Sequence, residues 1–211
     1  GNGVNYSPLV ISSLGTTTVT PTASLTIRSI QSVHPITTVV ANMMNKYWIV
    51  STSNLSGLDI TGYFQYNDPD EITGTDASFV AERFTSVWNA DAALSVNPTT
   101  DRIHLTNASN LSGDFTANDA AAFLSDPNLI VSVSAGAWDN AANWSPATVP
   151  SLATQNVYIK HAITASASPR AVNDLKISPT GTFAPGAQSF TVGGNWLIQS
   201  GGSLTLGSNN F

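Results

Sequence analysis

Carboxylates gather in one short stretch of this chain. Asp68, Asp70 and Glu71 surround Pro69, and Asp76 follows shortly after them. Oxygen donors at such spacing are the ligands that Ca²⁺ takes in proteins. The sequence therefore predicts that Asp68, Asp70 and Asp76 could hold a calcium ion, with an ordinary solvated acidic loop as the alternative.

The acidic stretch does not follow the EF-hand pattern. Counted from Asp68, the fifth position is Ile72 and the twelfth is Phe79, where an EF-hand loop needs oxygen ligands. A second group, Asp114 with Asn118 and Asp119, also offers oxygen ligands. Capping of a short helix is the alternative interpretation of that group.

Recognisable catalytic motifs are missing from the sequence. It contains no His-x-x-x-His, no Gly-x-Ser-x-Gly, and no phosphate-binding glycine motif after a strand. The histidines stand far apart in the chain: His34, His104 and His161. Glycoside hydrolysis needs two carboxylates about 5–10 Å apart, and no pairing stands out among Asp59, Glu82 and Asp101. We therefore expect a protein that is not an enzyme.

Composition excludes several classes of protein. Only 9% of the 211 residues are charged, with seven Lys and Arg and a net charge of −6, whereas a nucleic-acid partner requires a basic face. No apolar run approaches the roughly 20 residues that cross a bilayer. The absence of cysteine excludes disulfide scaffolds and thiolate metal sites. Abundant Ser, Thr and Asn with regular Gly and Pro is typical of extracellular or cell-surface β-proteins.

Short strand-like segments dominate the first part of the chain. They alternate apolar and polar residues, and turn residues such as Pro21, Asn54 and Gly57 lie beside them. The predicted strands are 9–11, 18–20, 25–28, 46–50, 58–66, 79–84 and 102–105. Helix candidates are limited to 77–88, where strand alternation competes, and 118–124. This spacing predicts an antiparallel β-sandwich over residues 1–130.

The remainder, residues 131–211, has a different amino-acid composition. All but one of the 13 carboxylates lie between Asp59 and Asp139, so the tail is almost uncharged. Aligning Leu175 with Leu197, and Gly181 with Gly202, gives a repeat of 21 to 22 residues. That period fits one rung of a parallel β-solenoid. Because solenoids need about three repeats to bury a core, we expect the natural chain to continue past Phe211.

A tryptophan-rich segment joins the two parts. Gly136-Ala137-Trp138 leads through Trp144 to Pro150 and is closed by Val157-Tyr158-Ile159. This pattern resembles the entry segment of large secreted surface proteins from Bacteroidetes-type bacteria, where it precedes a Gly-rich right-handed parallel β-helix.

Upstream segments resemble the β-sandwich module that often precedes that entry segment. They are Asn45-Lys46-Tyr47-Trp48, the stretch from Gly62 to Asp70, the stretch from Phe79 to Trp88, and Ser112-Gly113-Asp114-Phe115-Thr116. Lys46 stands where Arg is usual, and Asn156 stands where an acidic residue is common before Val157.

The resemblance implies an all-β, adhesin-like or scaffold protein outside the cell. Trp138 and Trp144 are then expected to cap the open end of the β-helix, with a sugar-stacking platform as the alternative role. Partners would be glycans or another cell surface, bound by weak multivalent contacts. The alternative function is a carbohydrate-binding module or a non-catalytic part of a polysaccharide-degrading enzyme. Flat threonine arrays for ice or mineral binding are a third possibility.

Overall fold

The computed structural model describes residues 8–165, 170–187 and 189–207. They form an all-β protein without an α-helix in these ranges. Phe211, past which the chain was expected to continue, lies outside them. The chain divides into two compact units, residues 1–125 and 126–211. The expected boundary followed residue 130, but β12 (Leu129–Ser132) pairs with strands of the second unit.

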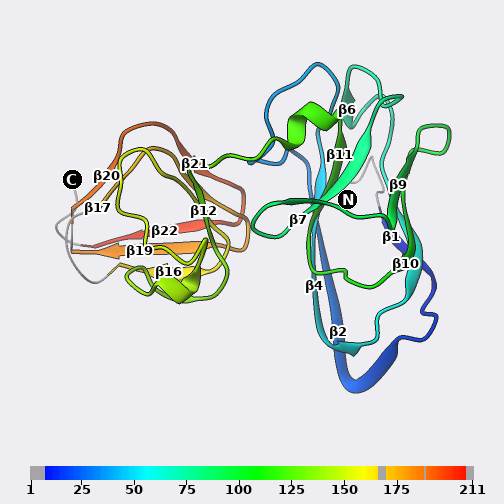
Figure 1. Ribbon diagram of the computed structural model, residues 1–211, viewed down its shortest axis with the longest axis horizontal. Coiled ribbons are helices and arrows are strands. Elements are labelled where there is room, and N and C mark those ends of the chain that lie inside the picture. The colour runs from blue at the N-terminus through cyan, green and yellow to red at the C-terminus, as the bar shows by residue number, and fades with distance from the viewer. Residues whose placement is uncertain (1–7, 166–169, 188, 208–211) are drawn as a thin grey trace. The chain divides into compact units, whose positions relative to one another are not determined.

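The first unit consists of two antiparallel sheets (Figure 1). One has the order β1-β5-β10-β9, and the other has the order β2-β4-β11-β3-β6, with β7 also paired to β11 and β8 paired to β7. The strands are β1 (Leu9–Ser13), β2 (Thr18–Ile30), β3 (Met43–Met44), β4 (Tyr47–Ser56), β5 (Ile60–Gln65), β6 (Ile72–Thr73), β7 (Val80–Phe84), β8 (Trp88–Ala90), β9 (Leu94–Asn97), β10 (Arg102–Ala108) and β11 (Gly113–Asn118).

Side chains from both sheets share one core. Along β5, Ile60, Gly62 and Phe64 alternate as buried residues, as the period of a strand requires. The Phe64 ring lies 5.1 Å from Trp48 of β4 and 5.0 Å from Phe115 of β11, between ring centroids. These aromatic contacts hold the two sheets together.

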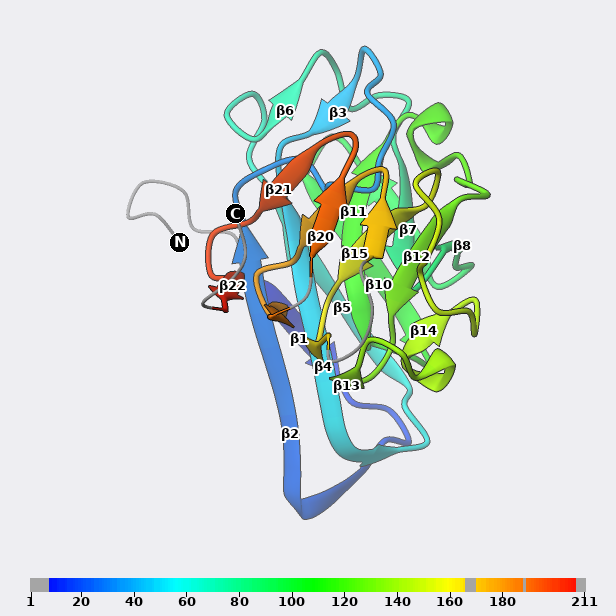
Figure 2. The same ribbon diagram turned by 90° about the vertical axis from the view of Figure 1, so that its left-hand side faces the viewer.

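The predicted break at Pro21 is wrong. The segments 18–20 and 25–28 belong to one strand, β2, because β2 is an edge strand and the missing proline N–H removes no ladder bond. An irregularity between Val19 and Ser24 lies opposite Asn54, which has a positive φ of 57°. Asn54 stays within β4 by donating its side-chain amide to Thr22 O and Oγ1. The β2–β4 ribbon is the longest pairing in Figure 2.

Neither helix candidate is an α-helix. The segment 77–88 contains β7, so its strand alternation outweighs its helical spacing. Within 118–124 there is one short 3₁₀ turn, η1 (Ala120–Phe123).

The second unit is built mainly from parallel ladders. The orders are β14-β12-β15-β18-β21, β13-β16-β19-β22 and β17-β20, all parallel except the β12–β14 pair. The elements are β12 (Leu129–Ser132), β13 (Gly136–Ala137), a 3₁₀ turn η2 (Ala141–Asn143), β14 (Trp144–Ser145), β15 (Asn156–Ile159), β16 (Ala162–Thr164), β17 (Arg170–Val172), β18 (Leu175–Ile177), β19 (Thr182–Gly186), β20 (Phe190–Val192), β21 (Trp196–Ile198) and β22 (Ser203–Leu206).

The pairing of the parallel strands confirms one part of the predicted repeat alignment and contradicts the other. Phe183 pairs with Leu204, as the glycine alignment predicts, but Leu175 pairs with Trp196 and not with Leu197. A shift of one residue would turn the inward side chains outward, since strand side chains alternate. Gly181 lies in the turn before β19, where an added Cβ would be 2.2 Å from Ile159 O, so only glycine permits this turn to approach the end of β15 so closely.

Candidate functional site

Three carboxylates from separate connections of the first unit meet at one place. Asp68 lies in the connection after β5, Asp76 lies between β6 and β7, and Asp101 lies between β9 and β10. Their oxygen ligand atoms all lie within 4.8 Å of one another. We call these residues the carboxylate cluster. Within the described residues, it is the one group of three or more potential metal ligands.

The cluster differs from the predicted ligand set by one residue. Asp70 is exposed in the turn beyond Pro69 and does not join it. Its place is taken by Asp101, which sequence spacing alone could not connect to Asp68. The backbone makes that connection, because Tyr66 N–H donates to Asp101 O at 2.9 Å and Asp68 N–H donates to Asp101 Oδ2 at 3.4 Å.

A buried tyrosine fixes Asp76. The Tyr66 hydroxyl donates to Asp76 Oδ2 at 2.6 Å, and both residues are buried. The pKa of Tyr66 is raised, first by its burial and next by this hydrogen bond to a carboxylate. Tyr66 therefore keeps its proton and remains a donor to Asp76.

The electrostatics of the cluster favour a cation. The pKa of Asp68 is raised by desolvation and then by the neighbouring charges of Asp76 and Asp101. Like charges so close disfavour ionisation, and a bound cation would reverse that effect. Three carboxylates can supply part of the six to eight oxygens that Ca²⁺ requires, with water completing the shell.

A buried ion pair anchors the loop that carries Asp68. Lys46 Nζ lies 2.5 Å from Glu71 Oε1, and the two residues are 1% and 0% exposed. Glu71 Oε2 accepts a hydrogen bond from Asn67 N–H at 3.1 Å. The Lys46 ammonium also lies 5.6 Å from the centre of the Trp48 ring, so one lysine joins this loop to the core.

The second acidic group, Asp114 with Asn118 and Asp119, does not form a set of metal ligands. Asn118 Oδ1 accepts from Met44 N–H, and Asp119 accepts from the side chains of Asn42 and Ser78. The alternative of helix capping also fails, because Asp119 makes no side-chain cap to η1.

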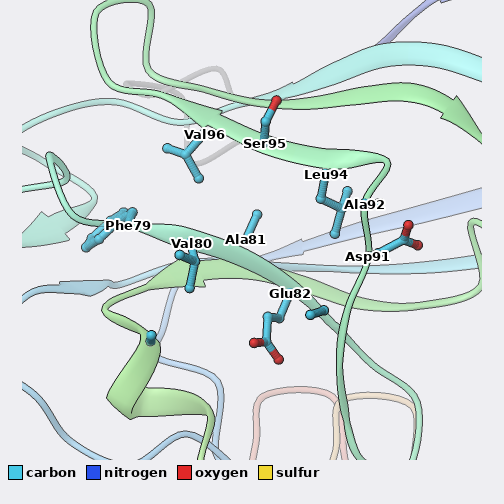
Figure 3. Close-up of a pocket in the computed structure, with 11 residues that line it drawn as sticks. Phe79, Val80, Ala81, Glu82, Asp91, Ala92, Leu94, Ser95 and Val96 are labelled. Atoms are coloured by element: carbon cyan, nitrogen blue, oxygen red, sulfur yellow. The ribbon is translucent and has the colours of Figure 1, made fainter.

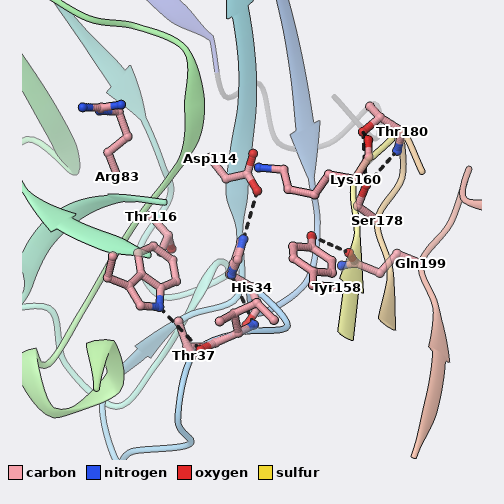
Figure 4. A network of polar contacts seen from close by, with 12 residues as sticks. His34, Thr37, Arg83, Asp114, Thr116, Tyr158, Lys160, Ser178, Thr180 and Gln199 are labelled. Atoms are coloured by element: carbon pink, nitrogen blue, oxygen red, sulfur yellow. Dashed lines mark hydrogen bonds and ion pairs between the residues drawn. The ribbon is translucent and has the colours of Figure 1, made fainter. Parts of the chain in front are cut away.

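Asp114 lies instead against His34, one of the three histidines that stand far apart in the sequence. Its Oδ2 is 3.1 Å from His34 Nε2, and Figure 4 shows the two side chains pointing toward each other. The His34 ring is 1% exposed and packs within 5.1 Å of Tyr47, Phe84 and Trp88, between ring centroids. This shell keeps solvent from the His34 ring and favours a structural role.

Trp138 and Trp144 are interior residues of the second unit. Trp138 Nε1 donates to Pro150 O at 2.9 Å, and Trp144 Nε1 donates to Trp138 O at 2.8 Å. Their rings contact each other, and Trp138 also contacts Phe183. Exposed fractions of 0% and 2% leave no ring face for a sugar, which argues against the stacking platform. Trp196, in contrast, is 42% exposed.

Comparisons with protein families, with curated proteins and with solved structures gave no match. No helix among the described residues is long and apolar enough to cross a membrane.

Proposed function

We propose that this chain is part of an adhesin-like, non-enzymatic scaffold or spacer at a bacterial cell surface. In this proposal the first unit is a β-sandwich, and the second unit is the beginning of a parallel β-helix capped by Trp138 and Trp144. The proposal rests on one observation, the stacking of successive parallel strands in the second unit.

Apolar side chains stack from strand to strand in that unit. Val157, Leu175 and Trp196 occupy matching positions of β15, β18 and β21, and Ile159, Ile177 and Ile198 do the same. Each added strand lengthens a stack by about 4.8 Å. Such stacking converts sequence length into physical length, which is what a spacer needs.

A polar ladder supports the same architecture at one corner of the stack. Asn156 donates to Asp126 Oδ2 at 2.7 Å and accepts from the Asn173 amide at 2.9 Å. One step further, Asn195 N–H donates to Asp174 Oδ1 at 2.9 Å. These hydrogen bonds pair the polar groups at the corner with amide side chains and with one acidic side chain at a time. This explains how an almost uncharged tail can still fold.

The open edge of the stack supports an extended assembly. Among the described strands, β21 pairs with β18 on one side only, and its residues Trp196, Leu197 and Ile198 are 42%, 40% and 44% exposed. An apolar strand with an open edge favours a further parallel strand.

A glycan array probed with and without Ca²⁺ tests this proposal against the carbohydrate-binding alternative. We expect no glycan binding under either condition, together with antibody labelling of the protein on intact cells. Binding of a glycan would instead support a lectin function and would refute the function of a spacer. Trp196→Ala would then show whether the exposed aromatic carries the contact, and labelling only after permeabilisation would refute the surface location.

A further inference from the structure

The outer face of the sheet β1-β5-β10-β9 carries polar and aromatic side chains. Half-buried and buried residues alternate along β10, so Arg102 and His104 point away from the shared core. On the neighbouring strand β5, Gln65 lies opposite Arg102 and Tyr63 lies opposite His104. Two basic side chains therefore share one face with an aromatic ring and an amide.

The flanking strands continue these rows of side chains. One row across the sheet is Val10, Tyr63, His104 and Ser95, and the next is Gln65, Arg102 and Asn97. Figure 3 shows Ser95 pointing to the opposite side of β9 from Leu94 and Val96, which pack against the core. We call these two rows the arginine face. Neither row contains an acidic residue.

Two contacts hold the side chain of Arg102 in place. Its Nε donates to Gln65 Oε1 at 3.0 Å, and its Cζ lies 4.0 Å from the centre of the Tyr63 ring. The second contact is a cation–π interaction. Neither contact uses the N–H groups on Nη1 and Nη2, so the guanidinium is fixed while its terminal donors stay available.

The charge of Arg102 has no anionic partner within the described part of the chain. The contacts with Gln65 and Tyr63 are its interactions there. Asp101, which precedes it, belongs to the carboxylate cluster, and Asp101 Oδ2 accepts from the Asp68 N–H at 3.4 Å. The arginine face therefore presents a positive charge that an anion from outside can neutralise.

The position of the guanidinium indicates which anion fits. A sugar stacks on a free aromatic face, but Arg102 already lies over the Tyr63 ring, and the His104 ring lies 6.2 Å from the Tyr63 ring on the same sheet face. The half-buried Tyr63 thus supports the guanidinium and does not offer that ring face to a sugar. A planar guanidinium binds a carboxylate through two parallel hydrogen bonds, so the arrangement favours a carboxylate.

The spacing along β10 indicates what kind of molecule carries the carboxylate. Arg102 and His104 are alternate residues of one strand, so they recur at about 6.8 Å, and alternate residues of an extended peptide have the same spacing. Two acidic residues separated by one residue in such a peptide can therefore reach Arg102 and His104 together. The first carboxylate would pair with the guanidinium, and the second would accept from an imidazole N–H.

We propose that the arginine face binds an extended acidic segment of a partner protein, with one carboxylate on Arg102 and the carboxylate two residues away on His104. This binding site is independent of the spacer function proposed above, because that function rests on the second unit and the arginine face belongs to the first.

The test is a titration of the isotope-labelled chain with the peptide acetyl-Thr-Glu-Val-Glu-Thr-amide, followed by the amide shifts of Arg102 and His104. A parallel peptide carries glutamine in place of both glutamates, and a second, acetyl-Thr-Glu-Glu-Val-Thr-amide, keeps the charge but changes the spacing. We expect the glutamine peptide to bind at least about tenfold more weakly, since hydrogen bonds to charged groups are lost. The peptide with adjacent glutamates should also bind more weakly, because only one of its carboxylates faces the sheet.

Three variants separate the contributions, each checked for an unchanged fold by its amide spectrum. Arg102→Gln should remove the preference for glutamate over glutamine. Arg102→Lys should weaken binding of the glutamate peptide, because it keeps the charge but loses the planar pair of donors. Arg28→Gln removes the same charge from β2 in the other sheet and should change nothing.

Three results would overturn the proposal. They are no binding of the glutamate peptide, equal affinities for the glutamate and glutamine peptides, and an unchanged preference in Arg102→Gln. Binding of oligogalacturonate with none of the glutamate peptide would also overturn it, because the arginine face would then recognise an acidic glycan and not a protein.

Discussion

The ion pair between Lys46 and Glu71 provides the sharpest test of how this fold is held together. Both groups are buried, their charged atoms are 2.5 Å apart, and Glu71 also accepts the Asn67 N–H. Removing one partner of such a pair leaves the other charge buried and uncompensated. We therefore expect Glu71→Gln and Lys46→Met each to lower the free energy of unfolding of the first unit by about 3–5 kcal/mol.

The double variant distinguishes this explanation from simple loss of packing. In Lys46→Met with Glu71→Gln, neither charge of the pair remains, and the new glutamine oxygen can still accept from Asn67. We expect the double variant to be less destabilised than the sum of the two single variants, with a coupling of about 2–3 kcal/mol.

Native-state hydrogen exchange of the β4 and β11 amides measures these free energies within one unit, which avoids assuming that both units unfold together. Asp91→Asn is the matched control. Its partner Arg83 lies 3.7 Å away, and the Asp91 side chain is 26% exposed, so the loss should be at most about 1 kcal/mol. Additive single effects, or a loss below about 1 kcal/mol for Glu71→Gln, would refute the reasoning.

Three further predictions concern the other features. If the carboxylate cluster binds a cation, Tb³⁺ excited through Tyr66 should luminesce, Ca²⁺ should compete, and Asp101→Asn should abolish the signal while Asp70→Asn preserves it. Loss of the signal in Asp70→Asn but not in Asp101→Asn would instead restore the ligand set expected from the sequence. Trp144→Ala should lower the free energy of unfolding of the second unit by about 3–5 kcal/mol, measured by urea unfolding, because it removes a buried ring and a hydrogen-bond donor. Trp196→Ala, at a half-exposed residue, should lower that free energy much less. Equal losses in the two variants would contradict the role of Trp144 as a cap. Leu197→Lys should lower self-association through the open edge of β21, seen by analytical ultracentrifugation, because charge protects an edge strand; an unchanged sedimentation profile would show that this edge does not associate.

Local patterns predict the strands well where one face is buried. The alternation over 58–66 and 102–105 becomes β5 and β10, because each strand places every second residue in the shared core. Local sequence patterns fail where the position of a strand within its sheet determines which residues it can contain. Pro21 reads as a break in isolation, and only the location of β2 at an edge makes it acceptable within a strand.

The carboxylate cluster shows the same limit for a site. Asp68 and Asp76 are near in sequence, and both joined the predicted set. Asp101 reaches them only because β10 pairs with β5, with Arg102 opposite Gln65, and a pairing between distant strands has no local signature. The sequence also offers no reason to reject Asp70, since only the path of the turn sends it into solvent.

Burial changes the meaning of the low charge of this chain. Only 9% of its residues are charged, and in the first unit Lys46, Glu71, Asp76 and Asp114 are among the buried ones. Several of these hold the fold together: Lys46 pairs with Glu71, and Tyr66 binds Asp76. Because four of the 20 charged residues are buried, burial does not enrich the surface in charge, and hydroxyl and amide side chains must provide much of its hydration.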